Sequence, residues 1–168
     1  MGSCPFGRLP PETGRCGQAL EHDSLRIRDI LVPVDGSVAS LDALALGCFL
    51  SKKNKGTVYA VYVIEVARNL PLDAEIAQES NRGEEILTRA EEVADSLDCK
   101  LSGELLQARD WGHAVVDEAI EREVSAIVMG VNFELTPGES LGQMSQYVVR
   151  HAPCRVILCR EAVKSEAR

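Results

Sequence analysis

Short apolar runs alternate with stretches of helical periodicity from Asp29 to Arg160, and this alternation restricts the chain to a few folds. The clearest run is TVYAVYVIEV at residues 57–66, which is rich in β-branched and aromatic residues. Further runs cover residues 30–34, 126–131 and 155–160, and residues 101–108 form a weaker strand signal that Gly103 interrupts. Continuous apolar runs of this length are typical of strands that are buried on both faces. The segments between them repeat their apolar residues every three or four positions, which predicts helices.

Strands that alternate with helices need crossover connections, and these produce a parallel sheet with helices on both faces. A chain of 168 residues fits one domain. We therefore predict a single α/β domain with a five-stranded parallel sheet over residues 29–160. Residues 1–28 lack periodicity and are interpreted as an irregular or disordered leader, and residues 161–168 as a tail. The leader is either a flexible extension without a role or a segment that orders on a protein partner.

Local signals set the expected limits of several helices. Ser40 is a plausible N-cap for the first helix, which should end near Asn54. The polar segment 72–83 predicts loop or frayed helix, and a strong apolar stripe begins only after Glu84. Pro33 lacks an amide donor, so it is tolerable only near the end of its strand.

Composition excludes several kinds of partner. The net charge of −8 argues against a nucleic acid or an anionic membrane surface. No apolar run approaches the roughly 20 residues that cross a bilayer. The beginning of the chain lacks the apolar stretch of a secretory signal, and the six cysteines form no CxxC pair. We therefore predict a cytoplasmic protein with reduced thiols.

The topology indicates where a ligand would bind. In open parallel sheets, ligands lie beyond the carboxyl ends of the strands, at the point where the strand order reverses. The residues that follow the first and fourth predicted strands are Asp35-Gly36-Ser37 and Gly130-Val131-Asn132. Asp35 and Gly130 are therefore candidate binding residues.

Three segments together resemble the universal stress protein family. They are ILVPVDGS at 30–37, IVMG at 127–130 and SQYVVRHAPCRVILC at 145–159, and the resemblance covers about residues 28–160. It implies strand order 3-2-1-4-5 in an adenine nucleotide alpha hydrolase-like fold. It also implies a homodimer that pairs the last strands of two subunits, here through Val156, Ile157 and Leu158. An apolar edge strand would need such cover in any case.

The resemblance also implies a nucleotide site. Many members of the family bind ATP through a loop of pattern G-x2-G-x9-G-[ST], whose glycines let the backbone approach the phosphates. Gly130 matches the first glycine, and Asp35 matches an aspartate that serves the adenine or ribose. The start of the following helix is a further candidate for anion binding, through Gly142, Gln143 and Ser145. ATP or AMP is the expected ligand, with Mg²⁺ only if ATP binds.

The rest of this loop departs from the pattern. Phe133 stands at the second glycine, Gly142 comes one residue early, and Gln143 replaces Ser or Thr. Between Gly130 and Tyr147 the chain has two glutamates, at positions 134 and 139, and no Lys or Arg. A triphosphate would be repelled by carboxylates at this place.

Two functions are favoured over a third, a slow ATP hydrolase or autophosphorylating enzyme. The first is a non-enzymatic, dimeric regulatory or interaction module with a degraded ATP site. The second is a stress-response sensor that binds ATP or AMP in the pocket at the reversal of strand order. The sequence shows no Ser/His/Asp set, metal-ligand cluster or Walker A motif, so we predict no catalytic residues and no metal site.

Overall fold

The computed structural model describes residues 26–131 and 141–160. The predictions for most of the leader, for Phe133, Glu134 and Glu139 and for the tail therefore lie outside the described residues. Strands and helices alternate along the described chain: β1 (Ile30–Pro33), α1 (Val38–Lys53), β2 (Val58–Glu65), α2 (Ala77–Ser96), β3 (Leu101–Ala108), α3 (Trp111–Glu121), β4 (Ala126–Val131), α4 (Gln143–His151) and β5 (Arg155–Arg160).

All five strands form one parallel sheet in the order β3-β2-β1-β4-β5, which confirms the predicted fold. β2 pairs with β3 over its whole length, from Val58 opposite Leu101 to Glu65 opposite Ala108. β1 lies at the centre and reverses the strand order, because β2 follows it on one side and β4 on the other. The topology thus places the ends of β1 and β4 next to each other, as the sequence predicted.

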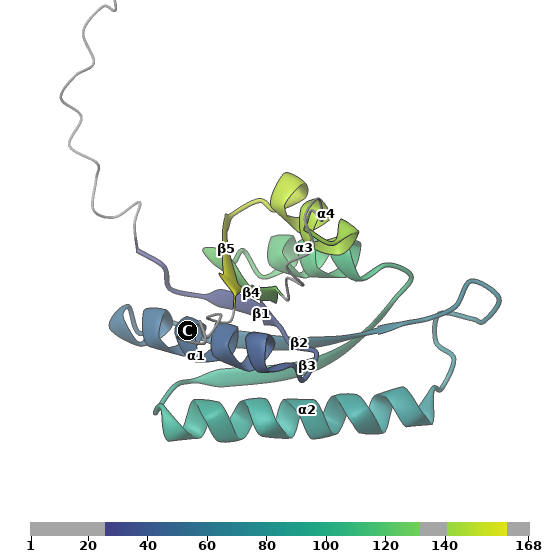
Figure 1. Ribbon diagram of the computed structural model, residues 1–168, viewed down its shortest axis with the longest axis horizontal. Coiled ribbons are helices and arrows are strands. Elements are labelled where there is room, and N and C mark those ends of the chain that lie inside the picture. Colours follow the sequence, from purple (N-terminus) through teal and green to yellow (C-terminus); the bar gives the residue numbers. More distant parts are fainter. Residues whose placement is uncertain (1–25, 132–140, 161–168) are drawn as a thin grey trace, which may run out of the picture.

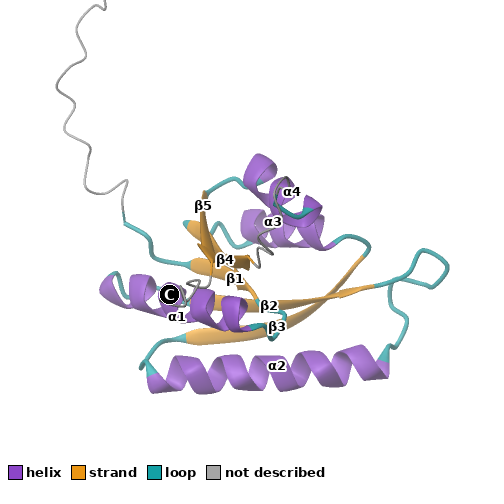
Figure 2. Ribbon diagram, in the orientation of Figure 1, coloured by secondary structure: helices purple, strands orange, loops and turns teal. Residues whose placement is uncertain are grey.

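Helices cover both faces of the sheet (Figures 1 and 2). α1 and α2 pack on one face, and α3 and α4 pack on the other. Successive side chains of a strand point to opposite faces, so Ile30 and Val32 enter the first core cluster while Leu31 enters the second. All three are fully buried. Two-sided burial of the inner strands β1, β2 and β4 explains their continuous apolar runs, whereas the edge strands β3 and β5 are less buried.

The predicted strands agree with the observed ones to within one residue at each end. Pro33 is the last residue of β1, so its missing donor falls at the strand's end, as the sequence required. The first helix ends at Lys53 with Asn54 as its C-cap, which confirms the predicted end.

The predicted N-cap of the first helix is wrong by one turn. Ser37, not Ser40, caps α1, because Ser37 has an extended backbone and its side chain accepts a hydrogen bond from the Ser40 amide at 3.2 Å. Ser40 lies inside the first turn, where its hydroxyl donates to the Ser37 carbonyl at 2.9 Å.

The second helix begins earlier than the apolar stripe indicated. α2 starts at Ala77, so the segment 72–83 divides into a loop and the first two turns or so of the helix. Tertiary packing explains the difference. Gly83 lies so close to Tyr62 that a Cβ atom there would be 2.7 Å from the Tyr62 ring. Contact with the sheet therefore stabilises helix in a segment whose own composition is polar.

Among the described residues, none of the helices is both long enough and apolar enough to cross a membrane.

Candidate functional site

A cavity of about 460 Å³ opens beyond the carboxyl ends of β1, β2 and β4. Its volume falls within the roughly 300–1,000 Å³ typical of small-molecule sites. β1, β4 and α4 contribute one part of its lining, and β2, α2 and the start of α3 contribute the other. The residues that line it are Pro33, Val34, Asp35, Ser40, Tyr62, Val63, Glu65, Glu79, Arg82, Trp111, Met129, Gly130, Met144 and Ser145.

Asp35 lies in the turn between β1 and α1. Its carboxylate accepts a hydrogen bond from the Ser37 amide at 2.8 Å, and its own amide donates to the Ser40 hydroxyl at 3.4 Å. Burial alone would raise the pKa of Asp35, but the hydrogen bonds from Ser37 and Ser40 outweigh it and lower that pKa. Asp35 is therefore an ionised acceptor in the lining of the cavity, and its place is set by the turn that it begins.

Gly130 lies near the end of β4, against the first turn of α1. A Cβ atom at this position would be 2.3 Å from the Ala39 carbonyl and 2.5 Å from the Ser40 amide nitrogen. Backbone atoms cannot yield at such distances, so only glycine fits here. The structure thus gives Gly130 a packing role: it lets α1 approach β4 and holds the Asp35 turn over the cavity.

The start of α4 forms the rim of the cavity near β4. Met144 and Ser145 line it, whereas Gly142 and Gln143 are not among the lining residues. Gly142 is the N-cap of α4, and among residues 26–131 and 141–160 no atom beyond its chain neighbours lies within 4 Å of a Cβ built there. The first amides of a helix have no partner within the helix, so this rim offers hydrogen-bond donors and the positive end of the helix dipole.

The opposite wall contains residues that the sequence did not single out. The Tyr62 hydroxyl donates to the Glu79 carboxylate at 3.1 Å, and Arg82 lies on the same helix three residues later. Burial raises the pKa of Tyr62, and the hydrogen bond to Glu79 raises it further. Tyr62 therefore keeps its proton at neutral pH and directs it at Glu79.

Glu65 and Trp111 also line the cavity and were not singled out by the sequence. Glu65 ends β2, and its carboxylate accepts a hydrogen bond from the Trp111 amide at 3.1 Å. The Trp111 side chain packs against the core cluster under α3 and α4 and also lines the cavity. The strand order could have indicated Tyr62 and Glu65, because β2 is the neighbour of β1. Glu79 and Arg82 give no signal in the sequence, because the polar composition of residues 72–83 predicts loop or frayed helix.

The described lining is acidic. Asp35, Glu65 and Glu79 contribute carboxylates, while Arg82 contributes the one positive charge among the described lining residues. Within residues 26–131 and 141–160, no three His, Cys, Asp or Glu side chains are grouped so as to hold a metal ion. The carboxylates of the lining can therefore accept hydrogen bonds from a ligand, and the backbone amides at the start of α4 can donate hydrogen bonds to it.

The sheet order, with β1 at its centre and a cavity where that order reverses, defines a doubly wound α/β protein with a crevice at the carboxyl ends of its strands. Within this class the family is settled by sequence. The chain belongs to the universal stress protein family, whose sequence model matches residues 26–160.

Individual relatives agree with this assignment. Universal stress protein MJ0531 of Methanocaldococcus jannaschii is 28% identical over 149 residues, which cover 82% of this chain and 84% of the relative. A solved structure from Archaeoglobus fulgidus in complex with dAMP has a TM-score of 0.64 and 19% identity, covering 80% of this chain and 98% of its own. A family member from Arabidopsis thaliana with AMP bound has a TM-score of 0.61 and 16% identity, covering 83% and 95%.

Proposed function

We propose that this protein is a non-enzymatic regulatory module that binds an adenine nucleoside monophosphate in the cavity beyond β1 and β4. The charge of the cavity wall is the main support for this proposal, because the described lining residues include three carboxylates and one guanidinium. A single phosphate at the rim formed by α4 tolerates such a wall, whereas a triphosphate would bring several negative charges against it. The complexes of two relatives with dAMP and AMP support the same ligand class.

The proposed contacts follow from the positions of the side chains. Asp35 is ionised, exposed and part of the lining, so it can accept hydrogen bonds from the ribose or the base. The amides at the start of α4, beside Ser145, favour the phosphate. The buried side chains of Val34 and Met129 supply apolar surface between these two places.

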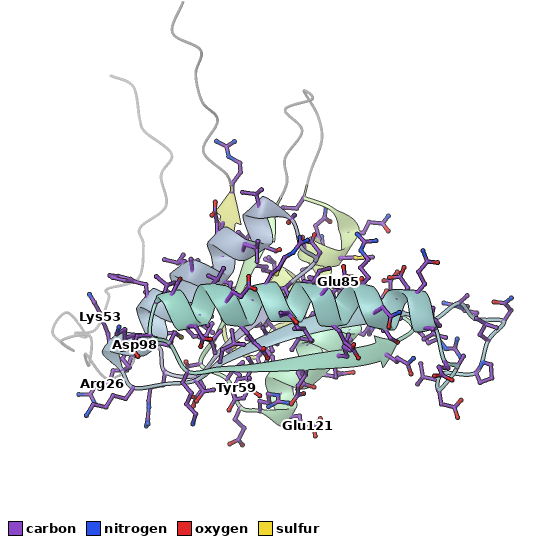
Figure 3. All side chains as sticks on the ribbon, turned by 90° about the horizontal axis from the view of Figure 1, so that it is seen from below. Arg26, Lys53, Tyr59, Glu85, Asp98 and Glu121 are labelled. Atoms are coloured by element: carbon purple, nitrogen blue, oxygen red, sulfur yellow. The ribbon has the colours of Figure 1, made fainter. Side chains whose placement is uncertain are left out.

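Isothermal titration calorimetry of the full chain with AMP, and with ATP plus Mg²⁺, tests the proposal. We expect AMP to bind at least about tenfold more tightly than ATP. We expect Asp35→Ala to weaken AMP binding by about tenfold or more, since it removes a charged acceptor. Glu85→Ala is a matched control, because Glu85 is an exposed acid that does not line the cavity (Figure 3).

Two results would overturn the proposal. One is no heat of binding with millimolar AMP. The other is sustained release of phosphate from ATP that disappears in Asp35→Ala, because this would make the protein an enzyme.

The second candidate function, an interaction module that forms a homodimer, is supported by the edge strand β5. Val156 and Ile157 are half-buried and Leu158 is 37% exposed on a strand that has β4 as its neighbour on one side only. An apolar strand edge without cover invites pairing with another chain. The proposed dimer pairs β5 of one subunit with β5 of the other.

Light scattering coupled to size exclusion measures this directly. We expect a mass twice the 18.3 kDa of the chain, and a monomer for Leu158→Glu. Ile120→Glu on α3 is the control, because Ile120 is also exposed but lies away from β5. A monomeric parent protein at micromolar concentration would contradict the dimer and would leave the nucleotide proposal intact.

A further inference from the structure

We propose that Cys48 and Cys99 form a modification site, in which a hydroperoxide oxidises the two thiols to a disulfide within the chain. Both are free thiols in the structure, and neither lines the cavity beyond β1 and β4. The site therefore lies apart from the candidate nucleotide site, and this proposal does not rest on nucleotide binding.

The fold brings the two cysteines into one apolar layer, although they are far apart in the chain. Cys48 belongs to the second half of α1, is 1% exposed and is part of the core cluster that α1 and α2 form with the sheet. Cys99 lies in the connection between α2 and β3, is half-buried and packs against the same cluster. One thiol is thus enclosed by the core, and the other lies where the core meets the solvent.

Hydrogen bonds hold the two thiols next to each other. The side chains of Cys48 and Cys99 are hydrogen-bond partners. Ser51 lies one turn after Cys48 on α1, and its hydroxyl oxygen is 3.6 Å from the Cys99 sulfur. The backbone of Cys99 is fixed by its amide, which donates to the Ala94 carbonyl at 2.9 Å. The Cys99 side chain is therefore directed at α1, beside the Cys48 thiol.

The two thiols differ in access to solvent, and this sets the order of the reaction. Burial, together with the hydrogen bond to Cys99, raises the pKa of Cys48 to about 12. Cys48 therefore stays protonated at neutral pH, and the core keeps dissolved peroxide away from it. Cys99 is the thiol that a small hydroperoxide reaches first. An accessible cysteine beside a second, resolving cysteine is the arrangement of many redox-sensing sites.

Hydrogen peroxide gives the simplest balanced reaction. The Cys99 thiol loses its proton, its sulfur attacks one peroxide oxygen, and the O–O bond breaks to give a sulfenic acid and one water molecule. The Cys48 thiol then loses its proton and attacks the sulfenic sulfur, the S–O bond breaks, and a second water molecule leaves. The protein gives up two hydrogen atoms and two electrons, and the peroxide is reduced. A dithiol reductant reverses the oxidation, so the disulfide is transient in a reducing compartment.

Two other cysteines provide comparisons within the same chain. Cys154 and Cys159 are half-buried like Cys99, and burial raises the pKa of each. The sheet separates Cys154 from Cys48, because Cys154 packs in the cluster under α3 and α4. Within residues 26–131 and 141–160, Cys48 and Cys99 are the two thiols that form a hydrogen bond with each other. Exposure alone therefore does not determine which thiols pair, whereas the contact between α1 and the start of β3 does.

Treatment of the full chain with hydrogen peroxide, followed by blocking of the remaining thiols and peptide mass spectrometry, tests the proposal. We expect the peptides that contain Cys48 and Cys99 to be joined, with the loss of two hydrogen atoms, and to separate again in dithiothreitol. In Cys48→Ala, Cys99 should stop at the sulfenic acid, which dimedone traps. Cys154→Ala is the matched control and should leave the link between Cys48 and Cys99 unchanged.

Several results would overturn the proposal. One is that millimolar peroxide produces no joined peptide in the folded protein. Another is that Cys99 becomes joined to Cys4 or Cys16 instead of Cys48. A third is a link between the Cys99 residues of two chains, which non-reducing electrophoresis shows as a doubled mass. None of these results bears on AMP binding, so the proposed function is tested separately.

A second variant guards against a misfolded Cys48→Ala protein. Thermal unfolding will show which variants are folded. In folded Cys99→Ala, Cys48 should stay reduced in millimolar peroxide, because the core encloses it. Rapid oxidation of Cys48 in that protein would contradict the role given to Cys99 as the thiol that meets the peroxide.

Discussion

At the amino ends of its strands the sheet is closed by hydrogen bonds between loops, whereas at the carboxyl ends it opens into the cavity. The Ser125 hydroxyl donates to the Asp29 carbonyl at 2.8 Å and accepts from the Arg28 amide at 2.9 Å. The Asp29 carboxylate accepts from the Thr57 amide at 2.9 Å. Figure 3 shows Arg26, Lys53 and Asp98 gathered at this same end of the molecule.

The two ends therefore use their polar groups differently. At the amino end, donors and acceptors of the chain satisfy one another, which stabilises the fold. At the carboxyl end, Asp35 and Glu79 accept hydrogen bonds from the chain and also line the cavity, where a carboxylate can accept more. The comparison indicates that substitutions at the amino end should change stability alone, whereas those at the carboxyl end should also change ligand binding.

The largest effect is expected at Gly56, at the closed end. A Cβ atom there would lie 1.9 Å from the Arg28 carbonyl oxygen, which belongs to the backbone and cannot move aside. Gly56→Ala should lower the free energy of unfolding by about 3 kcal/mol. Urea unfolding measures this loss. A loss below about 1 kcal/mol would show that the loop before β1 adjusts easily.

Gly130→Ala tests the open end in the same way. The added methyl group would push the first turn of α1 away from β4, because Ala39 and Ser40 lie in contact with Gly130. We expect a loss of about 2 kcal/mol in unfolding free energy together with weaker AMP binding. Gly142→Ala is the control, since open space surrounds that position, and it should change stability by less than about 0.5 kcal/mol. If Gly130→Ala is destabilised but binds AMP as the parent protein does, then packing at the carboxyl end does not affect binding. The proposed difference between the two ends of the sheet would then be wrong.

A smaller effect is expected for Ser125→Ala. The substitution removes the hydrogen bonds to Asp29 and Arg28 and should cost about 1–2 kcal/mol. AMP affinity should stay the same when it is measured on the folded protein, because the cavity lies at the other end of the strands. A change in affinity beyond about twofold would mean that the two ends are coupled.

The smallest effect is the pH dependence contributed by Asp35. The pKa of Asp35 is lowered in the folded protein, so folding favours its ionised form. The pKa of an Asp in an unfolded chain is about 3.9. The contribution of Asp35 to stability is therefore complete above that pH and is lost as the pH falls through the lower pKa of the folded protein. We expect the stability difference between the parent protein and Asp35→Asn to shrink below about pH 4. A difference that is constant from pH 7 to pH 2 in urea titrations would argue against this contribution.

Much of the fold was accessible from local patterns. The run at residues 57–66 predicts β2, and the run at 126–131 predicts β4, because strands buried on both faces leave an apolar signature. The start of α2 was not accessible, since Glu79 and its neighbours form helix only where Gly83 meets Tyr62. Likewise, the sequence does not distinguish Ser37 from Ser40 as the N-cap of α1, because both are good capping residues. In the structure the helix begins after Ser37, and its first turn packs against Gly130.

The residues of the candidate site also fall into those that the sequence indicates and those that it does not. Asp35 and Gly130 line the cavity because the ends of adjacent parallel strands must meet, and Ser145 on α4 lines it as well. That these residues bind a ligand stays a prediction. Tyr62, Glu79 and Trp111 come from elements whose contacts depend on how α2 and α3 cross the sheet. No spacing along the chain encodes that crossing.

By itself, the sequence determined the alternation of strands and helices, the parallel sheet and the place where a ligand would lie, because each depends on patterns within a few residues. Only the tertiary structure decided which side chains line the cavity at that place. The Tyr62–Glu79 hydrogen bond and the contact of Gly130 with α1 join residues far apart in the chain, and close packing of helices on the sheet is what brings them together.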